Sequence, residues 1–234
     1  MDEPPPRKRM VRLPSGGGDG RVQAARLKTA KLRTPSSQAW LNRQINDPYV
    51  AEAKAKGYRS RAAFKLIEID QKAHLLRRGM RVIDLGCAPG GWLQVLQERG
   101  AAAVVGIDLL PVDPVAGTTI LQGDFTDEGC GERLAALLGG PPDLILSDMA
   151  PNTTGHRETD HLRITGLIEA GADFAEKTLR PGGAFVAKAF QGGETAEVIA
   201  TLKRAFTDVR TLKPKASRTE SSEVFLVATG LKGR

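Results

Sequence analysis

The sequence predicts an α/β fold built on a mostly parallel, Rossmann-like sheet. From residue 81 onward, strand-like runs alternate with helix-length segments, and strands joined in this way form right-handed βαβ units. Runs such as AFVAKAF at 184–190 are apolar almost throughout, as strands covered on both faces are. The last two runs, near 207–214 and 221–230, have no helix between them, which predicts an antiparallel final pair.

Three helices are expected before the sheet begins. Ser36 and Ser37 are suitable N-caps for the first helix. The segment 48–57 has proline near its start and glycine at its end, which is typical of a helix. Ser60 precedes the segment 61–72, in which apolar residues recur at helical spacing.

The sheet and its covering helices follow. The expected strands are 81–86, 102–110, 118–125, 143–149 and 184–190, and then the final pair. The expected helices lie at 91–99, near 132–138, in a long segment that ends near residue 179, and at 195–206.

Basic charge is concentrated at the N-terminus. Residues 1–35 hold nine Lys and Arg against three acidic residues and account for most of the formal net charge of +7. Segments such as PPPRKR and PSGGGDG cannot build a core, which predicts a disordered tail. Such a tail either contacts a polyanion such as nucleic acid or only increases solubility, and both interpretations stay open. Residues 36–234 are expected to form a single domain.

Composition disfavours several classes of protein and site. Two cysteines and three histidines, none at metal-ligand spacing, predict neither a disulfide framework nor a metal site. No apolar run is long enough to span a bilayer, and no signal-peptide segment follows the N-terminus, so a soluble, cytoplasmic protein is expected. Acidic residues and three prolines in the Arg-rich N-terminus argue against a mitochondrial presequence. Because no apolar stripe is left unexplained, we expect a monomer without a membrane partner.

The segment DLGCAPGGW follows the first strand of the sheet and opens a helix, where Rossmann-like folds bind ligands. Compared with a dinucleotide-binding G-x-G-x-x-G loop, it keeps Gly86 but has Ala88 in place of the middle glycine, and Pro89 lacks a backbone donor. A ligand with an adenosine but no phosphates suits this loop better. Trp92 either packs on that ligand or belongs to the core.

Acidic residues close the next two strands. Asp108 stands 22 residues after Gly86, where a carboxylate accepts hydrogen bonds from both ribose hydroxyls of an adenosine. Asp124 ends the third strand and is placed to accept from the exocyclic amine of the adenine. Together with the glycine loop, the two carboxylates predict a nucleoside ligand.

Asp148 ends the fourth strand, at the mouth of the expected site. It is followed by Met149, Ala150 and Pro151, and not by the two prolines and aromatic residue typical of enzymes that methylate a base amine. Neither cysteine is placed to attack a pyrimidine carbon. Both common base chemistries are therefore disfavoured.

Three further charges stand inside apolar runs. Lys188 lies at the end of the fifth strand, the expected neighbour of the fourth, so its amine can approach Asp148. Lys65 lies in AAFKLI, and Glu223 lies in SSEVFLV. Taken singly, Lys65 also fits a solvated helix face and Glu223 the outer face of an edge strand. Together the three charges and Asp148 indicate a charged cluster.

Seven segments resemble, in order and spacing, the motifs of one known family: RSRAAFKL, DLGCAPGGW, DLLP, QGDF, SDMAPN, VAKAFQG and SSEVFLVATG. The family is the FtsJ-like ribose 2'-O-methyltransferases, and the resemblance runs from about residue 36 to residue 230. It implies a Rossmann-like S-adenosylmethionine-dependent methyltransferase fold with seven strands, the last antiparallel. It also implies a catalytic Lys-Asp-Lys-Glu tetrad at Lys65, Asp148, Lys188 and Glu223. The cofactor positions it implies are Gly90, Trp92, Asp108, Asp124 and Asp148. The basic tail is longer than the family pattern.

The resemblance further implies 2'-O-methylation of a uridine in large-subunit (23S) ribosomal RNA, on the assembled 50S ribosomal subunit. Lys188 is the expected general base, because a ribose 2'-hydroxyl must lose its proton as it attacks the methyl group. Lys65 disfavours the charged form of Lys188, whereas the carboxylates favour it. The sequence therefore leaves the protonation state of Lys188 open. Two alternatives also stay open: a tRNA ribose 2'-O-methyltransferase, and a non-catalytic RNA-binding factor of ribosome assembly.

Basic residues near the first helices and after the sixth strand are candidates for binding RNA phosphates. They are Lys54, Arg59, Arg61, Lys215 and Arg218. Taken singly, each also suits an ordinary solvated position.

Overall fold

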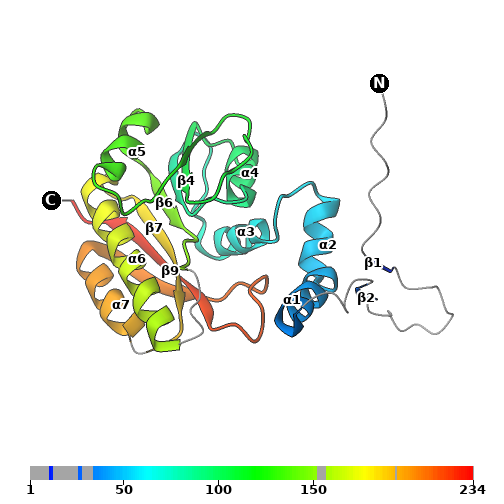
Figure 1. Cartoon of the computed structure of the whole chain (residues 1–234). Helices are drawn as coiled ribbons and strands as arrows, with labels where there is room; N and C mark the ends of the chain where they lie inside the picture. The colour runs from blue at the N-terminus through cyan, green and yellow to red at the C-terminus, as the bar shows by residue number, and fades with distance from the viewer. Residues whose placement is uncertain (1–10, 13–25, 28–33, 152–156, 193, 234) are drawn as a thin grey trace, which may run out of the picture. The chain divides into compact units, whose positions relative to one another are not determined.

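The computed structural model describes residues 11–12, 26–27, 34–151, 157–192 and 194–233 (Figure 1). The chain divides into two compact units, residues 1–57 and residues 58–234. This division falls after the second helix, whereas the sequence predicts a boundary between tail and domain after residue 35.

The first unit contains two short strands and two helices. They are β1 (Val11–Arg12), β2 (Arg26–Leu27), α1 (Pro35–Ile45) and α2 (Pro48–Ala55). β1 and β2 pair antiparallel, and the other residues of the predicted tail up to residue 33 lie outside the described part of the chain. Thr34 caps α1 by accepting from the amide of Ser37 at 3.3 Å, and Asp47 caps α2 by accepting from the amide of Tyr49 at 3.0 Å. Both helices then begin with proline, which needs no amide partner there.

The second unit is built on a seven-stranded sheet in the order β5-β4-β3-β6-β7-β9-β8. The strands are β3 (Arg81–Leu85), β4 (Ala103–Asp108), β5 (Thr119–Gln122), β6 (Leu144–Ser147), β7 (Ala184–Phe190), β8 (Phe206–Leu212) and β9 (Glu223–Leu231). Neighbours from β5 to β7 pair parallel, and β9 pairs antiparallel with β7 and with β8. The predicted α/β fold with an antiparallel last strand is confirmed.

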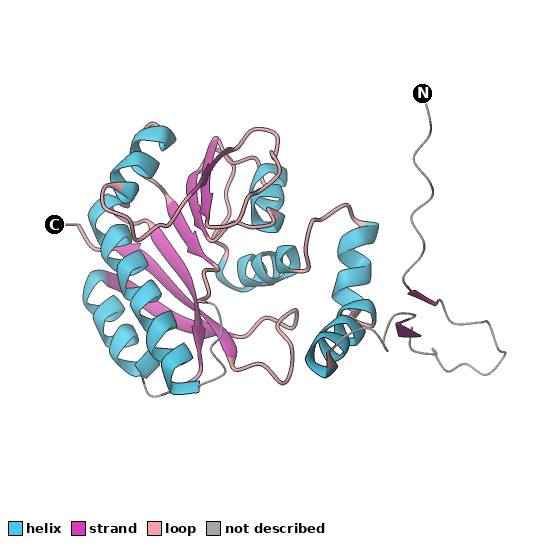
Figure 2. Cartoon of the chain, viewed as in Figure 1, coloured by secondary structure: helices cyan, strands magenta, loops and turns pink. Residues whose placement is uncertain are grey.

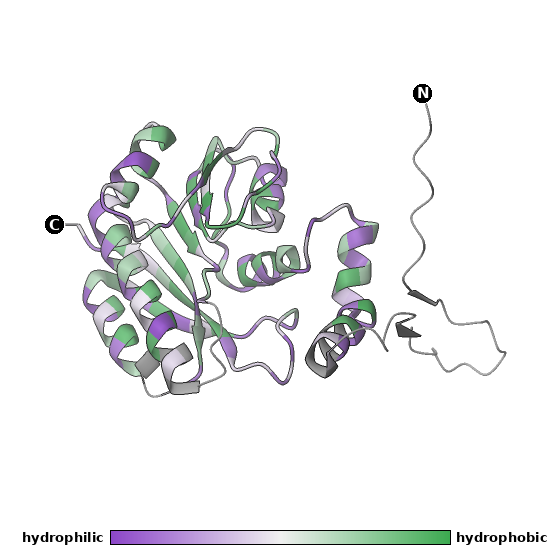
Figure 3. Cartoon of the chain, in the orientation of Figure 1, coloured by the Kyte–Doolittle hydropathy of each residue, from purple (hydrophilic) through white to green (hydrophobic). Residues whose placement is uncertain are grey.

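Helices cover both faces of this sheet (Figure 2). α3 (Ala62–Ala73) and α4 (Gly91–Glu98) pack on one face; α5 (Cys130–Leu138), α6 (Arg157–Thr178) and α7 (Glu194–Ala205) pack on the other. The central strands are strongly apolar (Figure 3), as expected for parallel strands between two helix layers. Of the described helices, none is long and apolar enough to cross a bilayer.

The position of β3 in the sheet determines where a ligand can bind. β4 lies on one side of β3 and β6 on the other, so the chain order reverses there, and open α/β sheets bind ligands at such a point. Because these strands are parallel, their carboxyl ends meet at one edge. Gly86, Asp108, Asp124 and Asp148 lie at or just after those ends.

Alternation along β7 and β9 determines which face receives the charged residues. Val186 and Phe225 pack in the core beneath α3 and α4. Because side chains two residues apart point to the same face of a strand, Lys188 and Glu223 also face the α3 side. The antiparallel register pairs Lys188 with Phe225, which makes Glu223 a diagonal neighbour of Lys188.

Candidate active site

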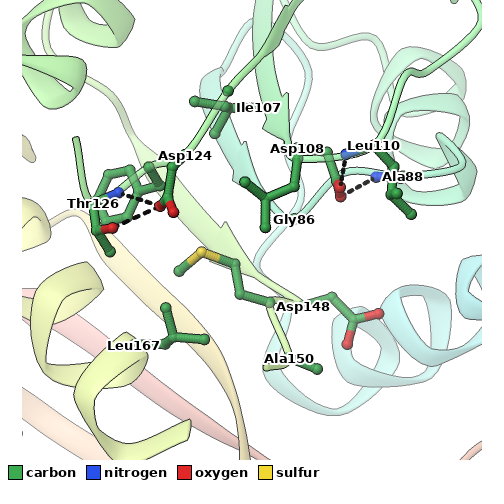
Figure 4. A pocket seen from close by; sticks show the side chains of 14 residues that line it. Gly86, Ala88, Ile107, Asp108, Leu110, Asp124, Thr126, Asp148, Ala150 and Leu167 are labelled. Atoms are coloured by element: carbon green, nitrogen blue, oxygen red, sulfur yellow. Dashed lines mark hydrogen bonds between the residues drawn. The ribbon is translucent and has the colours of Figure 1, made fainter. Parts of the chain in front are cut away.

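A cavity of about 310 Å³ opens at the carboxyl ends of β3 to β6 (Figure 4). Four residues predicted to bind a cofactor line it: Gly86, Asp108, Asp124 and Asp148. Much of the remaining wall is apolar and includes Ile107, Leu109, Leu110, Phe125, Met149 and Leu167. Among the described residues that line the cavity, none is basic. The cavity therefore suits a ligand with an apolar ring and hydroxyl or amino donors better than one with phosphates.

Asp108 connects two loops at the rim of the cavity. Its Oδ2 accepts from the amide of Ala88 at 2.8 Å, and its Oδ1 accepts from the amide of Leu110 at 2.9 Å (Figure 4). These bonds tie the glycine loop after β3 to the segment after β4. Each carboxylate oxygen has a further lone pair, so Asp108 is still able to accept hydrogen bonds from the hydroxyl groups of a ligand.

Asp124 lies elsewhere on the cavity wall and is held by Thr126. Its Oδ1 accepts from the amide of Thr126 at 2.8 Å and from the hydroxyl at 2.7 Å. These hydrogen bonds, that of the hydroxyl first, lower the pKa of Asp124 below its usual range. The side chain is therefore an ionised acceptor at neutral pH.

The two predicted glycines shape the loop, and the predicted tryptophan packs behind it. Gly86 and Gly90 have positive φ of 79° and 104°. A Cβ at Gly86 would lie 2.8 Å from the amide nitrogen of Met149, so the close approach of the two loops requires glycine. The Trp92 side chain is 3% exposed, and its indole donates to the carbonyl of Ala62 at 2.7 Å. Neither Gly90 nor Trp92 lines the cavity, so of the two interpretations of Trp92 the structure supports the core.

Asp84 on β3 is a residue of this region that sequence reasoning missed. It is fully buried, and in the described structure neither carboxylate oxygen has a hydrogen-bond partner. Burial, and then the charges of Asp148 and Asp108, raise its pKa well above the usual range. Burial is also the main cause that raises the pKa of the Cys87 thiol, which agrees with the prediction that this cysteine is not a nucleophile. The available signal was a carboxylate inside the apolar run RVIDL, the same kind of signal that identified Lys188.

The first ion pair of the predicted tetrad joins Lys188 to Asp148. Lys188 is 8% exposed, and its Nζ lies 3.0 Å from Asp148 Oδ1. The amine is directed mainly at the main-chain carbonyl of Asp148, to which it donates a short hydrogen bond, so the carboxylate contact is ionic rather than a well-aligned hydrogen bond. Two acceptors on one residue thus hold the amine at the end of β7.

The second ion pair joins Lys65 to Glu223. Lys65 Nζ lies 2.8 Å from Glu223 Oε2, and both side chains are largely buried, at 13% and 14% exposure. Lys65 also lies over the Phe225 ring, 5.7 Å from its centroid. Lys65 therefore does not lie on a solvated helix face, and Glu223 does not point into solvent from an edge strand. The four predicted tetrad residues form two ion pairs on the α3 side of the sheet.

Two polar residues beside the second pair were missed by sequence reasoning. Ser217 is 5% exposed, and its hydroxyl donates to Glu223 Oε1 at 2.6 Å. Glu68 on α3 accepts from the main-chain amides of Lys215 and Ala216. No periodicity or motif signals these contacts. Those of Glu68 join a helix to a loop about 150 residues later in the chain, and that of Ser217 depends on how the same loop folds back onto β9.

Two of the arginines predicted to bind RNA have contacts within the protein. The Arg59 guanidinium donates to the carbonyls of Pro89 and Pro114, at 3.2 and 2.7 Å, and to that of Asp113. The Arg61 guanidinium donates to the carbonyl of Ala216. RNA binding by these two arginines stays a prediction.

The other predicted RNA-binding residues have different exposures. Lys54 on α2 and Lys215 are exposed, and Arg218 is half-buried. RNA binding by these residues also stays a prediction. Within the described ranges, no group of three or more His, Cys, Asp or Glu is arranged to hold a metal ion.

Comparison with protein families and curated proteins gives consistent matches. The model of the FtsJ-like methyltransferases matches residues 58–231. A protein of Caulobacter sp. strain K31 named ribosomal RNA large subunit methyltransferase E is 69% identical, over 96% of this chain and 100% of the relative. A protein of the same name from Acidiphilium cryptum strain JF-5 is 62% identical, over 91% and 95%.

Solved structures similar to this chain include one ribosomal RNA methyltransferase and one protein that shares only the fold. A crystal structure assigned as a ribosomal RNA methyltransferase from Plasmodium falciparum has a TM-score of 0.67 and 33% identity, over 76% of this chain and 100% of that chain. A structure assigned as a hemolysin from Lactococcus lactis has a TM-score of 0.53 at 19% identity, over 73% and 86%, and shows likeness of fold alone. On the family model and the curated relatives together, this chain belongs to the FtsJ-like methyltransferase family.

Proposed function

We propose that this chain transfers the methyl group of S-adenosylmethionine to the ribose 2'-oxygen of a uridine in large-subunit (23S) ribosomal RNA, at the assembled 50S stage. The observation that carries the proposal is the buried Lys188–Asp148 ion pair at a cavity lined by three carboxylates. A candidate base and a candidate adenosine site are thus adjacent. The relatives named ribosomal RNA large subunit methyltransferase E support the choice of substrate.

The described residues of the cavity fit S-adenosylmethionine. Asp108 would accept from the ribose hydroxyls, and Asp124 would accept from the exocyclic amine of the adenine. Leu109, Leu110 and Phe125 would pack on the ring. Trp92, which does not line the cavity, supports the glycine loop from the core side in this proposal.

Lys188 is the base in the proposed reaction. S-adenosylmethionine supplies, when bound, a methyl group on a positively charged sulfur. Lys188, in its neutral form, takes the proton of the 2'-hydroxyl at Nζ as the ribose oxygen bonds to the methyl carbon; the bond between that carbon and sulfur breaks, and S-adenosylhomocysteine leaves. The carboxylate and the carbonyl of Asp148 fix the position of that nitrogen.

The Lys65–Glu223 pair binds and orients the ribose. Because the two side chains are already paired with each other, together they add no net charge beside Lys188. Their polar atoms are available to hydrogen-bond the sugar on the α3 side of the sheet. Orientation of this kind contributes on the order of 7–11 kcal/mol to bimolecular reactions.

The chemistry indicates an RNA substrate because only RNA has a 2'-hydroxyl. The segment after Asp148 has Met149, Ala150 and Pro151, and it offers no aromatic residue on which a flipped base could stack. On the same proposal the enzyme works as a monomer, without a metal ion, in the bacterial cytoplasm where large subunits are assembled. Its tail, residues 1–35, and its methyltransferase domain, residues 36–234, are separate parts in this proposal.

The deciding experiment measures methyl transfer from labelled S-adenosylmethionine to large ribosomal subunits that lack the modification, with tRNA in parallel. The expected product is 2'-O-methyluridine in the large-subunit RNA. Label in tRNA alone would keep the chemistry and replace the substrate. Absence of label in both RNAs, with S-adenosylmethionine still bound, would support the non-catalytic assembly factor instead.

A further inference from the structure

We propose that Ser217 is a positioning residue of the methyl-transfer reaction, which fixes the Glu223 carboxylate and through it the Lys65 amine. The inference rests on the proposed function and deepens it, because it adds a fifth residue to the four predicted ones. Ser217 lies in the loop between β8 and β9, outside the charged tetrad itself.

The contacts of Glu223 define the role of the hydroxyl. Oε1 accepts from Ser217 Oγ at 2.6 Å, and Oε2 accepts from Lys65 Nζ at 2.8 Å. In the described structure each oxygen therefore has one side-chain donor, one from helix α3 and one from the loop before β9. A carboxylate held at both oxygens has a fixed plane, whereas one held at a single oxygen is free to rotate about its terminal torsion, which has a broad energy profile.

The loop that carries Ser217 is itself built onto α3. The amide of Ser217 donates to the carbonyl of Pro214 at 3.0 Å, which closes a turn. Glu68 accepts from the amide of Ala216 at 3.2 Å, and Arg61 donates to the carbonyl of the same residue. The residue before Ser217 is thus bonded at both its amide and its carbonyl, and Ser217 is placed by main-chain contacts.

The helical spacing on α3 connects this loop to the tetrad. Arg61, Lys65 and Glu68 are separated by four and three residues, so they lie on one face of the helix. Arg61 and Glu68 hold the loop, and Lys65 between them holds Glu223. The contacts run from Ser217 through Glu223 to Lys65. The same helix face therefore positions the loop that carries Ser217 and also provides Lys65.

Loss of the hydroxyl has a specific predicted effect. In Ser217→Ala, Glu223 Oε1 loses its donor and the Lys65 amine loses a fixed partner, so the ribose is oriented less well. We expect kcat to fall about tenfold, while KM and Kd for S-adenosylmethionine stay unchanged. The cofactor constants serve as a readout because a general structural defect would move them as well.

The experiment is a double-mutant cycle in the full chain, with large ribosomal subunits as substrate and all assays below the lowest melting temperature of the variants. It compares wild type, Ser217→Ala, Glu223→Gln and the double variant by single-turnover transfer of labelled methyl groups. We expect Ser217→Ala to cost less than about twofold in the Glu223→Gln background, since the hydroxyl acts through that carboxylate. The matched control is Thr219→Ala, an exposed residue of the same loop whose described contact is its backbone carbonyl.

Three outcomes would overturn the inference. One is a kcat within twofold of wild type for Ser217→Ala. Another is an equal loss from Ser217→Ala in the wild-type and Glu223→Gln backgrounds, which would indicate a general effect on the loop. A wild-type chain that transfers no methyl group to either RNA would instead refute the proposed function itself, and the inference with it.

Discussion

Lys188 is the residue on which the proposed reaction depends most. Lys188→Ala removes the proton acceptor but leaves the cavity-lining carboxylates in place, so we expect the transfer rate to fall by about 10²–10⁴-fold. The affinity for S-adenosylmethionine should stay close to that of wild type. Single-turnover transfer and calorimetric titration measure the two quantities. Lys203→Ala, an exposed lysine on α7, is the control, and a fully active Lys188→Ala would refute the role.

Asp84 gives a prediction on stability. The pKa of Asp84 is higher in the folded chain than in the unfolded chain. At a pH between these two pKa values, the folded chain keeps a proton that the unfolded chain has lost. The free energy of unfolding therefore falls as the pH rises through this range. Asp84→Asn has no proton to lose. We expect the ligand-free variant to be more stable at pH 7 by about 1–3 kcal/mol, and its advantage to vanish as the pH approaches 4.

Melting curves of wild type and Asp84→Asn between pH 4 and pH 8 test this prediction. The control is Asp173→Asn, which removes an exposed carboxylate 2.6 Å from Lys177. A difference in melting temperature that is the same at every pH would show that the variant acts through packing and not through the proton.

Single residues were predictable where a charge interrupts an apolar pattern. Lys188 and Glu223 stand in buried strands, and alternation predicts that both face the same side of the sheet. Ser217 was not predictable in this way, because a serine in a polar loop gives no signal until the fold brings it to Glu223. Trp92 stayed ambiguous because the first turn of a helix contacts both a ligand loop and the core.

At the scale of elements, Arg59 holds the loop after β4 against the glycine loop. Its guanidinium contacts carbonyls in both loops, and Leu109 and Leu110 of the first loop line the cavity. We expect Arg59→Ala to weaken S-adenosylmethionine binding about tenfold, with little dependence on salt, because the lost contacts are internal. Calorimetry at two salt concentrations measures the effect.

The control for Arg59 is Arg210→Ala, an exposed arginine of β8 at the edge of the sheet. Unchanged cofactor affinity for Arg59→Ala, combined with a salt-dependent loss of RNA affinity, would favour the phosphate-binding role instead. The two roles are therefore separable in one variant.

The strands and helices of the second unit were largely predictable from the sequence. The sheet strands are apolar, and the helices have apolar residues at regular spacing, so local pattern and tertiary environment agree. The loop between β8 and β9 was not predictable, since its course depends on Glu68 of α3 and on Arg61 just before that helix as well as on turns within the loop. The edges of the site are therefore determined by contacts between distant segments.

At the scale of the whole molecule, the second unit contains both apolar cores. Their buried residues begin at Ala63 and end at Leu231, and the family model covers 58–231. We expect a chain of residues 58–234 to fold and to bind S-adenosylmethionine as the full chain does. This shorter chain lacks most of the excess of lysines and arginines over acidic residues that gives the full chain its net positive charge. Its affinity for RNA should therefore be lower and depend less steeply on salt concentration.

Melting, cofactor titration and RNA binding at two salt concentrations test this truncation against the full chain. Equal RNA affinity at low salt would show that residues 1–57 only increase solubility. Failure of the truncated chain to fold would show that the first unit completes the core of the second.

β9 follows β8 in the chain but lies between β7 and β8 in the sheet. During synthesis, β8 therefore emerges before the strand it must pair with exists, and β7 keeps an open hydrogen-bonding edge until residues 223–231 have been added. Open edges pair with other chains. A chain interrupted before Glu223 thus lacks a residue of the predicted tetrad and also exposes such an edge. We therefore expect an incomplete product to aggregate or be degraded, and not to persist as an inactive competitor for the RNA.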